Sequence, residues 1–179
     1  SAAWSGSGPK EIADGLSGIL FRSLRLDLVY VRVNDLGGGV AYETARTPRG
    51  PVPADQLEAI GSLFAPQLTS GHAAAADIPH PLGTGTLRAV ITPLGYDGDC
   101  GFLVVASAPG DFPTHTDRLI LGVAANQAAI VLQQRRSQER VRRSEQELAD
   151  FFDNATVGLH WVGPDGTIIR ANQAELALL

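Results

Sequence analysis

The sequence predicts an α+β fold in which helices flank a central antiparallel sheet. Strand-like runs with alternating apolar residues occur in pairs joined by glycine- and aspartate-rich turns, which is typical of antiparallel hairpins. Runs with helical spacing of apolar residues stand before, between and after these pairs. With 44% hydrophobic and 18% charged residues over 179 positions, the composition suits one good core plus appendages.

The first half of the chain is expected to form a helix, two strands and a helix. The first helix is predicted at 9–25, where a proline stands near the first turn and apolar residues share one stripe. Strands are predicted at 27–34 and 40–47, and an amphipathic helix at 53–68. The first strand alternates between two faces: Val29, Val31 and Val33 against Leu28, Tyr30 and Arg32.

The second half is expected to add a hairpin and a long helix. Residues 72–86 hold an alanine run, two prolines and two glycines, and are interpreted as an irregular segment or a short edge strand followed by a loop. Strands are predicted at 86–94 and 100–107. A long helix is predicted at 117–152, with Thr114 or Thr116 as its cap.

After the long helix the sequence predicts a short hairpin and the start of another helix. Strands at 158–162 and 167–170 flank the turn Pro164-Asp165-Gly166. Asp-Gly between two apolar runs is a hairpin signal, because glycine tolerates the positive φ of tight turns. A helix is expected to begin near Asn172.

Over residues 9–134 this order of elements resembles a GAF domain. The resemblance is also carried by the strand Asp-Gly-Asp-Cys-Gly-Phe-Leu-Val-Val-Ala-Ser at 97–107 and by the loop Asp111-Phe112-Pro113 before the last helix. It implies a GAF-like central antiparallel sheet with the terminal helices on one face and a small-molecule pocket on the other.

The end of the chain resembles the opening of a PAS domain. The resemblance is carried by the spacing of Phe152, Ala155, Gly158, Leu159, Asp165, Gly166, Ile168 and Asn172. Such a domain needs about a hundred residues to close its sheet, so the chain is expected to hold an incomplete PAS hairpin and helix and to be part of a longer protein. The absence of methionine agrees with this expectation.

The predicted organisation has four parts. Residues 1–8 are a flexible tail or cloning remnant, 9–134 a GAF domain, 135–152 a coiled-coil linker helix, and 153–179 the N-terminal elements of a PAS domain. GAF followed by PAS through a continuous helix is a layout that sensor histidine kinases share, so the resemblance implies a bacterial signalling protein.

The long helix carries a heptad series that predicts a dimer seam. Its a and d positions are Ile120, Val123, Gln127, Ile130, Gln134, Ser137, Val141, Ser144, Leu148 and Phe151. The favoured interpretation is a homodimer through the terminal helices, with a parallel two-stranded coiled coil between identical chains. The alternative is a solvated connector helix, and the first part of the stripe could also pack on the chain's own sheet.

Several functional classes are disfavoured by the residues. No phosphate-binding glycine loop, paired-histidine metal motif or nucleophile elbow occurs, so we expect no catalytic activity and no metal site. A net charge of −5 argues against nucleic-acid binding. No apolar run is long enough for membrane insertion. The single cysteine permits a reducing, cytoplasmic location.

Ligand binding is the function that the resemblance leaves open. If the valine face of the first strand packs on helices, Tyr30 and Arg32 face the pocket, where an arginine fork could hold an anionic group. Further candidates for a lid or pocket wall are Tyr42, His72, His80 and Tyr96. The alternative is that Arg32 pairs with Glu43 on the neighbouring strand.

The ligand itself is left unknown. A covalent bilin is not expected, because Cys100 opens a strand and precedes Gly101. The cyclic-nucleotide signature of GAF relatives is missing, and methionine sulfoxide reduction in such relatives uses several cysteines. Haem bound by His72 or His80 is the least favoured class.

The resulting prediction is a sensory GAF module of a two-component protein, with a histidine kinase as the expected parent. It would bind a small molecule or partner and relay the signal through a dimeric helix to PAS and output domains. Alternatives are a ligand-free GAF dimerisation module and the regulatory region of a diguanylate cyclase or phosphatase. A roomy cavity on the sheet's second face favours sensing, and a face filled by side chains favours the dimerisation module.

Overall fold

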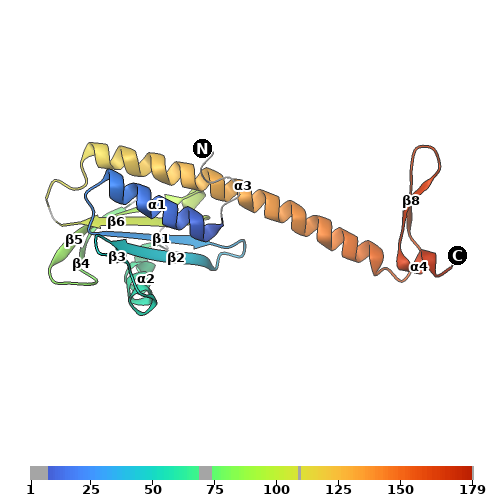
Figure 1. The fold of residues 1–179 in the computed structure, drawn as a ribbon, viewed down its shortest axis with the longest axis horizontal. Coiled ribbons are helices and arrows are strands. Elements are labelled where there is room, and N and C mark those ends of the chain that lie inside the picture. Colours follow the sequence, from blue (N-terminus) through green and yellow to red (C-terminus); the bar gives the residue numbers. More distant parts are fainter. Residues whose placement is uncertain (1–7, 69–73, 109, 179) are drawn as a thin grey trace. The chain divides into compact units, whose positions relative to one another are not determined.

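The computed structural model describes residues 8–68, 74–108 and 110–178 (Figure 1). Its contacts divide the chain into two compact units, Ser1–Gln134 (unit 1) and Arg135–Leu179 (unit 2). Helix α3 (His115–Asp153) contributes residues to both. The predicted tail at 1–8 lies outside the described residues except for Gly8, which caps the first helix.

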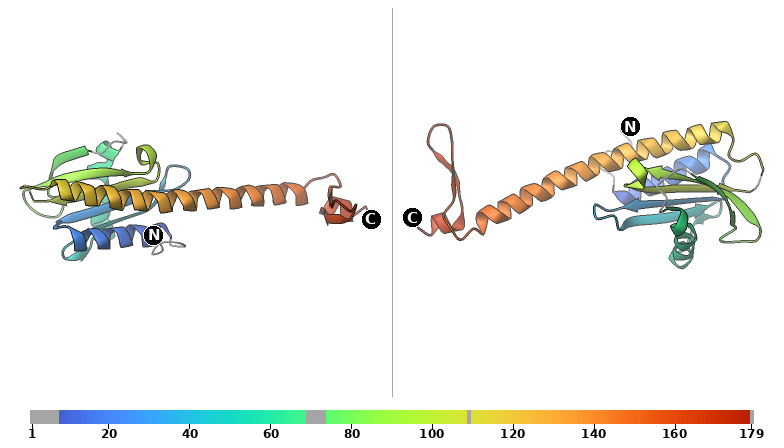
Figure 2. Two further views of the ribbon diagram at one scale, coloured as in Figure 1. Left: turned by 90° about the horizontal axis from the view of Figure 1, so that it is seen from above. Right: turned by 180° about the vertical axis from the view of Figure 1, so that it is seen from behind.

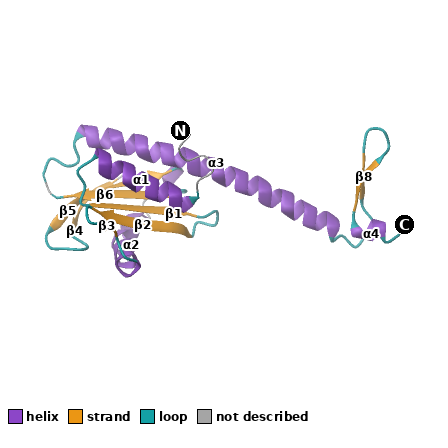
Figure 3. Ribbon diagram, in the orientation of Figure 1, coloured by secondary structure: helices purple, strands orange, loops and turns teal. Residues whose placement is uncertain are grey.

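Unit 1 is built on a six-stranded antiparallel sheet in the order β3-β2-β1-β6-β5-β4 (Figure 3). The strands are β1 (Leu28–Asn34), β2 (Val40–Thr47), β3 (Gly50–Pro51), β4 (Ala74–Pro79), β5 (Thr86–Leu94) and β6 (Gly101–Ser107). At the centre β1 pairs with β6, from Leu28 opposite Ala106 to Val33 opposite Gly101. The predicted α+β class with an antiparallel sheet is confirmed.

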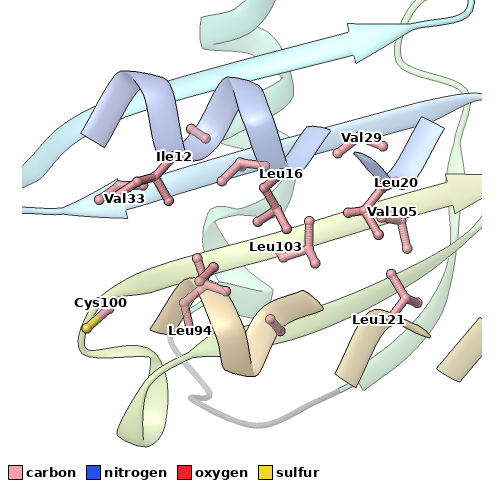
Figure 4. Close-up of a cluster of buried hydrophobic side chains, with 14 of the residues drawn as sticks. Ile12, Leu16, Leu20, Val29, Val33, Leu94, Cys100, Leu103, Val105 and Leu121 are labelled. Atoms are coloured by element: carbon pink, nitrogen blue, oxygen red, sulfur yellow. The ribbon is translucent and has the colours of Figure 1, made fainter. Parts of the chain in front are cut away.

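Helix α1 (Pro9–Ser23) and the first half of α3 lie side by side on one face of this sheet (Figures 1 and 2). Figure 4 shows their apolar side chains meeting those of the central strands. The cluster takes Ile12, Leu16 and Leu20 from α1, Val29, Val31 and Val33 from β1, Leu103 and Val105 from β6, and Leu121, Ala125 and Ala128 from α3. The prediction that the valine face of β1 packs on helices is confirmed.

Helix α2 (Ala54–Leu68) covers the opposite face. Ile60 and Phe64 pack there on Tyr30 and Phe102, and the rings of Tyr30 and Phe64 are 5.7 Å apart between centroids. All four side chains are buried. Unit 1 therefore buries apolar side chains on both faces of one sheet, a three-layer arrangement.

Local interactions explain where elements begin and end. Thr114 caps α3 reciprocally: its Oγ1 accepts the Asp117 N–H at 3.1 Å, and Asp117 Oδ2 accepts the Thr114 N–H at 2.8 Å. The ambiguous segment forms β4, an edge strand paired with β5. Gly101 opens β6 with φ +132°, and a Cβ there would collide with the Arg32 carbonyl oxygen, so this position requires glycine.

Unit 2 contains the end of α3, the strands β7 (His160–Val162) and β8 (Ile168–Ala171), and helix α4 (Gln173–Leu176). The predicted hairpin is confirmed: Gly166 has φ +82°, and Asp165 Oδ1 accepts the Thr167 N–H at 3.1 Å. Across the parts of the chain that the structure describes, none of the helices combines the length and apolar character that a membrane span needs.

Candidate ligand-binding site

Tyr30 and Arg32 lie on the α2 face of β1, as the alternation of the strand predicts. The Tyr30 hydroxyl donates a hydrogen bond to Glu43 Oε2 at 2.8 Å. Burial, followed by this hydrogen bond, raises the pKa of Tyr30 well above its ordinary value. Gly61 of α2 passes close by, since a Cβ there would lie 3.3 Å from the Tyr30 hydroxyl oxygen. Tyr30 is therefore a core residue whose hydroxyl is bonded to Glu43.

Arg32 is half-buried beside this pair and stands opposite Glu43 in the strand register. Its Nε donates to Asn34 Oδ1 at 3.3 Å, and Asn34 Nδ2 donates to the Gly98 carbonyl at 3.2 Å. The described side chains of Arg32 and Glu43 form no ion pair; the carboxylate accepts the tyrosine hydroxyl instead. The alternative of an Arg32–Glu43 pair is therefore wrong.

The structure places the other candidates apart from this pair. Tyr42 lies on the α1 face, where it packs against the helix-covered core and its ring centroid is 5.5 Å from the Lys10 ammonium. Tyr96 is 81% exposed in the turn between β5 and β6. His72 lies outside the described residues. Of the predicted site residues within the described ranges, the structure brings only Tyr30 and Arg32 together.

His80 instead lines a separate surface cavity of about 530 Å³. Three connections surround this cavity: the β2–β3 turn, the entry to α2 and the β4–β5 turn. Arg49, Val52 and Gln56 line it from the first two, and His80 and Leu82 from the third. Its volume falls in the range of about 300–1,000 Å³ that is usual for small-molecule sites.

The β4–β5 turn fixes the imidazole of His80. The ring Nδ1 accepts the Leu82 backbone N–H at 3.1 Å, and the backbone N–H of His80 donates to the Gly85 carbonyl at 2.9 Å. The turn closes tightly on the ring, since a Cβ at Gly83 would lie 3.2 Å from ring atoms. Because Nδ1 is an acceptor, the neutral ring carries its proton on Nε2, which is left as a donor.

Arg49 was missed by the sequence analysis. It is exposed in the β2–β3 turn, where its N–H donates to Thr47 Oγ1 at 3.2 Å. The run Thr47-Pro48-Arg49-Gly50 could have signalled a charged residue held in a turn, because proline and glycine punctuate such turns. No ion pair joins Arg49 to another residue of the described ranges.

The heptad positions of α3 in unit 1 differ from the residues that α3 packs on the sheet. The buried stripe is Leu121, Ala125, Ala128 and Leu132. Val123 and Ile130 remain 64% and 48% exposed, and Gln127 and Gln134 are exposed with them. Only Ile120 of the predicted seam packs partly against the core. The chain's own sheet therefore does not cover the seam positions from Val123 to Gln134.

The later heptad positions, in unit 2, are also exposed. They are Ser137, Val141, Ser144, Leu148 and Phe151. The next residue, Phe152, is buried, and its ring lies 5.2 Å from that of Trp161 on β7. The Arg170 guanidinium stands 4.7 Å from the Phe152 ring and donates to Asp153 Oδ2 at 2.9 Å. The last residues of α3 thus contact both strands of the hairpin.

Asn172 organises the rest of unit 2. It is fully buried, and its Oδ1 accepts the Leu159 N–H and the Glu175 N–H, each at 2.9 Å. Its Nδ2 donates to the Val157 carbonyl at 2.9 Å. One side chain thereby joins the segment before β7 to the N-terminus of α4.

Comparison with protein-family models gave no match, and none of the curated proteins searched matches the chain.

Proposed function

We propose that the chain is the sensory and regulatory part of a bacterial two-component signalling protein, with a sensor histidine kinase as its parent. Unit 1 is a GAF-like module, residues 135–152 are its linker, and 153–179 are the first elements of a PAS-like domain. The antiparallel sheet with both terminal helices on one face supports the GAF assignment. The β7–β8 hairpin, followed by Asn172 as the N-cap of α4, supports the PAS assignment.

One observation carries this proposal: α3 has two separate apolar stripes. The stripe through Leu121 and Ala128 packs against the sheet of unit 1, whereas Val123 and Ile130 remain exposed. Two more seam residues, Val141 and Leu148, are 58% and 57% exposed. A second copy of the same helix would cover such a series at the a and d positions. Formation of the dimer would bury these exposed apolar side chains of α3.

The charges beside the seam favour a parallel dimer. In the heptad register Arg140 is a g position and Glu145 is the e position of the next heptad. In a parallel coiled coil these two positions face each other across the interface, so each chain gives one opposite-charge pair. Both side chains are exposed and available for this contact. In an antiparallel pair g positions face g positions, and Arg140 loses this partner.

The contacts at the end of α3 suggest how a signal would leave the helix. Phe152 and Asp153 hold Trp161 and Arg170 of the hairpin. A change in the twist or register of the paired helices would therefore act on the first strands of the PAS-like domain. Polar Ser137 and Ser144 weaken the seam, which keeps alternative helix arrangements close in free energy.

Disulfide cross-linking of the full chain tests the dimer. Cys100 is buried, so a cysteine introduced on α3 is the accessible thiol. We expect Val141→Cys and Ser144→Cys to give disulfide-linked dimers under mild oxidation. The matched control is Gln146→Cys, an exposed f position of the same heptads, which should not cross-link. Equal yields of cross-linked dimer at all three positions, or no cross-linked dimer at the two seam positions, would contradict the parallel coiled coil.

A second function is favoured by the α2 face of the sheet. Its middle is occupied by the buried side chains of Tyr30, Phe64 and Phe102. This observation supports a ligand-free GAF dimerisation module, in which α3 pairs without a chemical input. The cavity at His80 supports sensing, and saturable binding there separates the two functions. A diguanylate cyclase or phosphatase parent would use the same relay.

A further inference from the structure

The cavity at His80 is lined by two side chains that carry hydrogen-bond donors. Nε2–H of His80 is one, because Leu82 holds Nδ1 as an acceptor. The guanidinium of Arg49 is the other, on a turn whose backbone is fixed by the bond from its N–H to Thr47 Oγ1. The His80 ring is held before binding, whereas the exposed Arg49 side chain loses rotamer freedom when it binds an acceptor.

The remaining walls of the cavity limit the ligand. Val52, Pro53 and Leu82 provide apolar surface beside the two donors. Asp27 also lines the cavity, and its Oδ2 accepts the Ala108 N–H at 2.7 Å at the end of β6. One guanidinium and one carboxylate balance in charge, so a ligand with several negative charges would be repelled by Asp27. A single oxyanion group attached to a small apolar body suits this lining.

We propose that this cavity binds a small organic monoanion, whose carboxylate group is held by Arg49 and by His80 Nε2–H. The inference names the ligand class of the sensory site and in that respect rests on the proposed function. Arg49 supplies the charge and a planar fork of donors, and His80 adds a directed hydrogen bond. The apolar body of the ligand packs on Val52 and Leu82.

Titration of the full chain, labelled with nitrogen-15, tests the proposal by nuclear magnetic resonance. The probes are isobutyrate, as a carboxylate with an apolar body, and inorganic phosphate, each at constant ionic strength set with sodium chloride. We expect a saturable shift of the His80 ring nitrogens and of the Arg49 Nε–H signal. Saturation with isobutyrate supports the carboxylate site, whereas saturation with phosphate alone would contradict a monoanion site.

Variants of exposed residues separate specific binding from general charge. Arg49→Gln removes a charged hydrogen-bond donor and should weaken binding about tenfold or more. Arg49→Lys keeps the charge without the fork and should weaken it less. The matched control Arg118→Gln, an exposed arginine of α3 outside the cavity lining, should leave the affinity unchanged.

Three results would overturn the inference: shifts that rise linearly without saturation, equal affinities of the parent and Arg49→Gln, or equal losses in Arg49→Gln and Arg118→Gln. The cross-linking of α3 is read independently. Cross-linking at Val141 without saturable binding at His80 would contradict the ligand site and still support the helical dimer. Saturable binding without cross-linking would support the ligand site and contradict the proposed relay through a helical dimer.

Discussion

Units 1 and 2 are stabilised by different kinds of contact. Unit 1 buries branched and aromatic side chains on both faces of its sheet, and its deepest residues, such as Leu16, Leu103 and Phe64, are fully buried. Unit 2 leaves most of its large apolar side chains exposed, including Ile168 and Ile169 on β8. Its order comes from Asn172, the Arg170–Asp153 pair and one aromatic contact.

The two units should therefore respond differently to substitutions. Apolar burial contributes in proportion to area and is spread over many side chains of unit 1. Hydrogen bonds of a buried amide are few and directional, and losing them leaves several backbone groups without partners at once. Unit 1 should therefore unfold cooperatively as one body, whereas unit 2 should depend on single residues and open locally.

The largest effect is expected from a cavity in unit 1. Leu103→Ala removes a fully buried side chain from between the sheet and helices α1 and α3, and should lower the free energy of unfolding by about 2–5 kcal/mol. Urea denaturation followed by circular dichroism measures this change. Leu119→Ala, at an exposed position of α3, is the control and should change stability little. Similar losses in both variants would contradict the account of the core.

A smaller and local effect is expected in unit 2. Asn172→Ala leaves the N–H groups of Leu159 and Glu175 without their acceptor and should destabilise unit 2 by about 1–3 kcal/mol. Asn172→Asp keeps that acceptor but loses the donor to the Val157 carbonyl, so its effect should be smaller.

Amide hydrogen exchange measures both variants of Asn172. Protection of Leu159 and Glu175 should fall in the order wild type, Asn172→Asp, Asn172→Ala, while amides of β1 and β6 keep their protection. Equal loss of protection in unit 1 would show that the two units unfold together and would contradict their separate stabilisation.

Most element positions could be predicted because periodicity and turn residues act locally. The valine alternation of β1 fixes its two faces, and Asp165-Gly166 fixes the hairpin of unit 2. The stripe of α3 that packs on the sheet was harder to recognise. It contains Ala125 and Ala128, small residues that let the helix approach closely but give a weak apolar signal beside Val123 and Ile130.

The candidate site was predicted only in part, for reasons of register and tertiary folding. Tyr42 lies opposite Val33, on the α1 face, because the turn between β1 and β2 sets this pairing. A shift of one residue in that turn would turn Tyr42 to the other face, and the sequence does not specify the shift. Arg49 and His80 are 31 positions apart and meet at one cavity only after the sheet has formed.

Tyr30 is the place where unit 1 departs from apolar packing, and it provides the smallest of the expected effects. Burial, with the hydrogen bond to Glu43, raises its pKa from the ordinary value of 10.0, so the folded protein keeps the phenol proton when the unfolded chain has lost it. The stability from this shift is complete below pH 10.0 and is lost as the pH rises toward the raised pKa, by up to about 1.4 kcal/mol per pH unit.

Tyr30→Phe should abolish the part of the pH dependence of stability that comes from this phenol, and so separate the polar from the apolar contributions within unit 1. At neutral pH it loses one hydrogen bond, worth about 1 kcal/mol. Above pH 10 its stability should fall less steeply than that of the wild type, so the difference between the two proteins narrows. Urea denaturation at several alkaline pH values measures this, with the exposed Tyr96→Phe as control. Parallel curves for wild type and Tyr30→Phe would mean that the phenol loses its proton at the same pH in the folded and the unfolded protein, and burial with the Glu43 contact would then add no pH dependence to an otherwise apolar core.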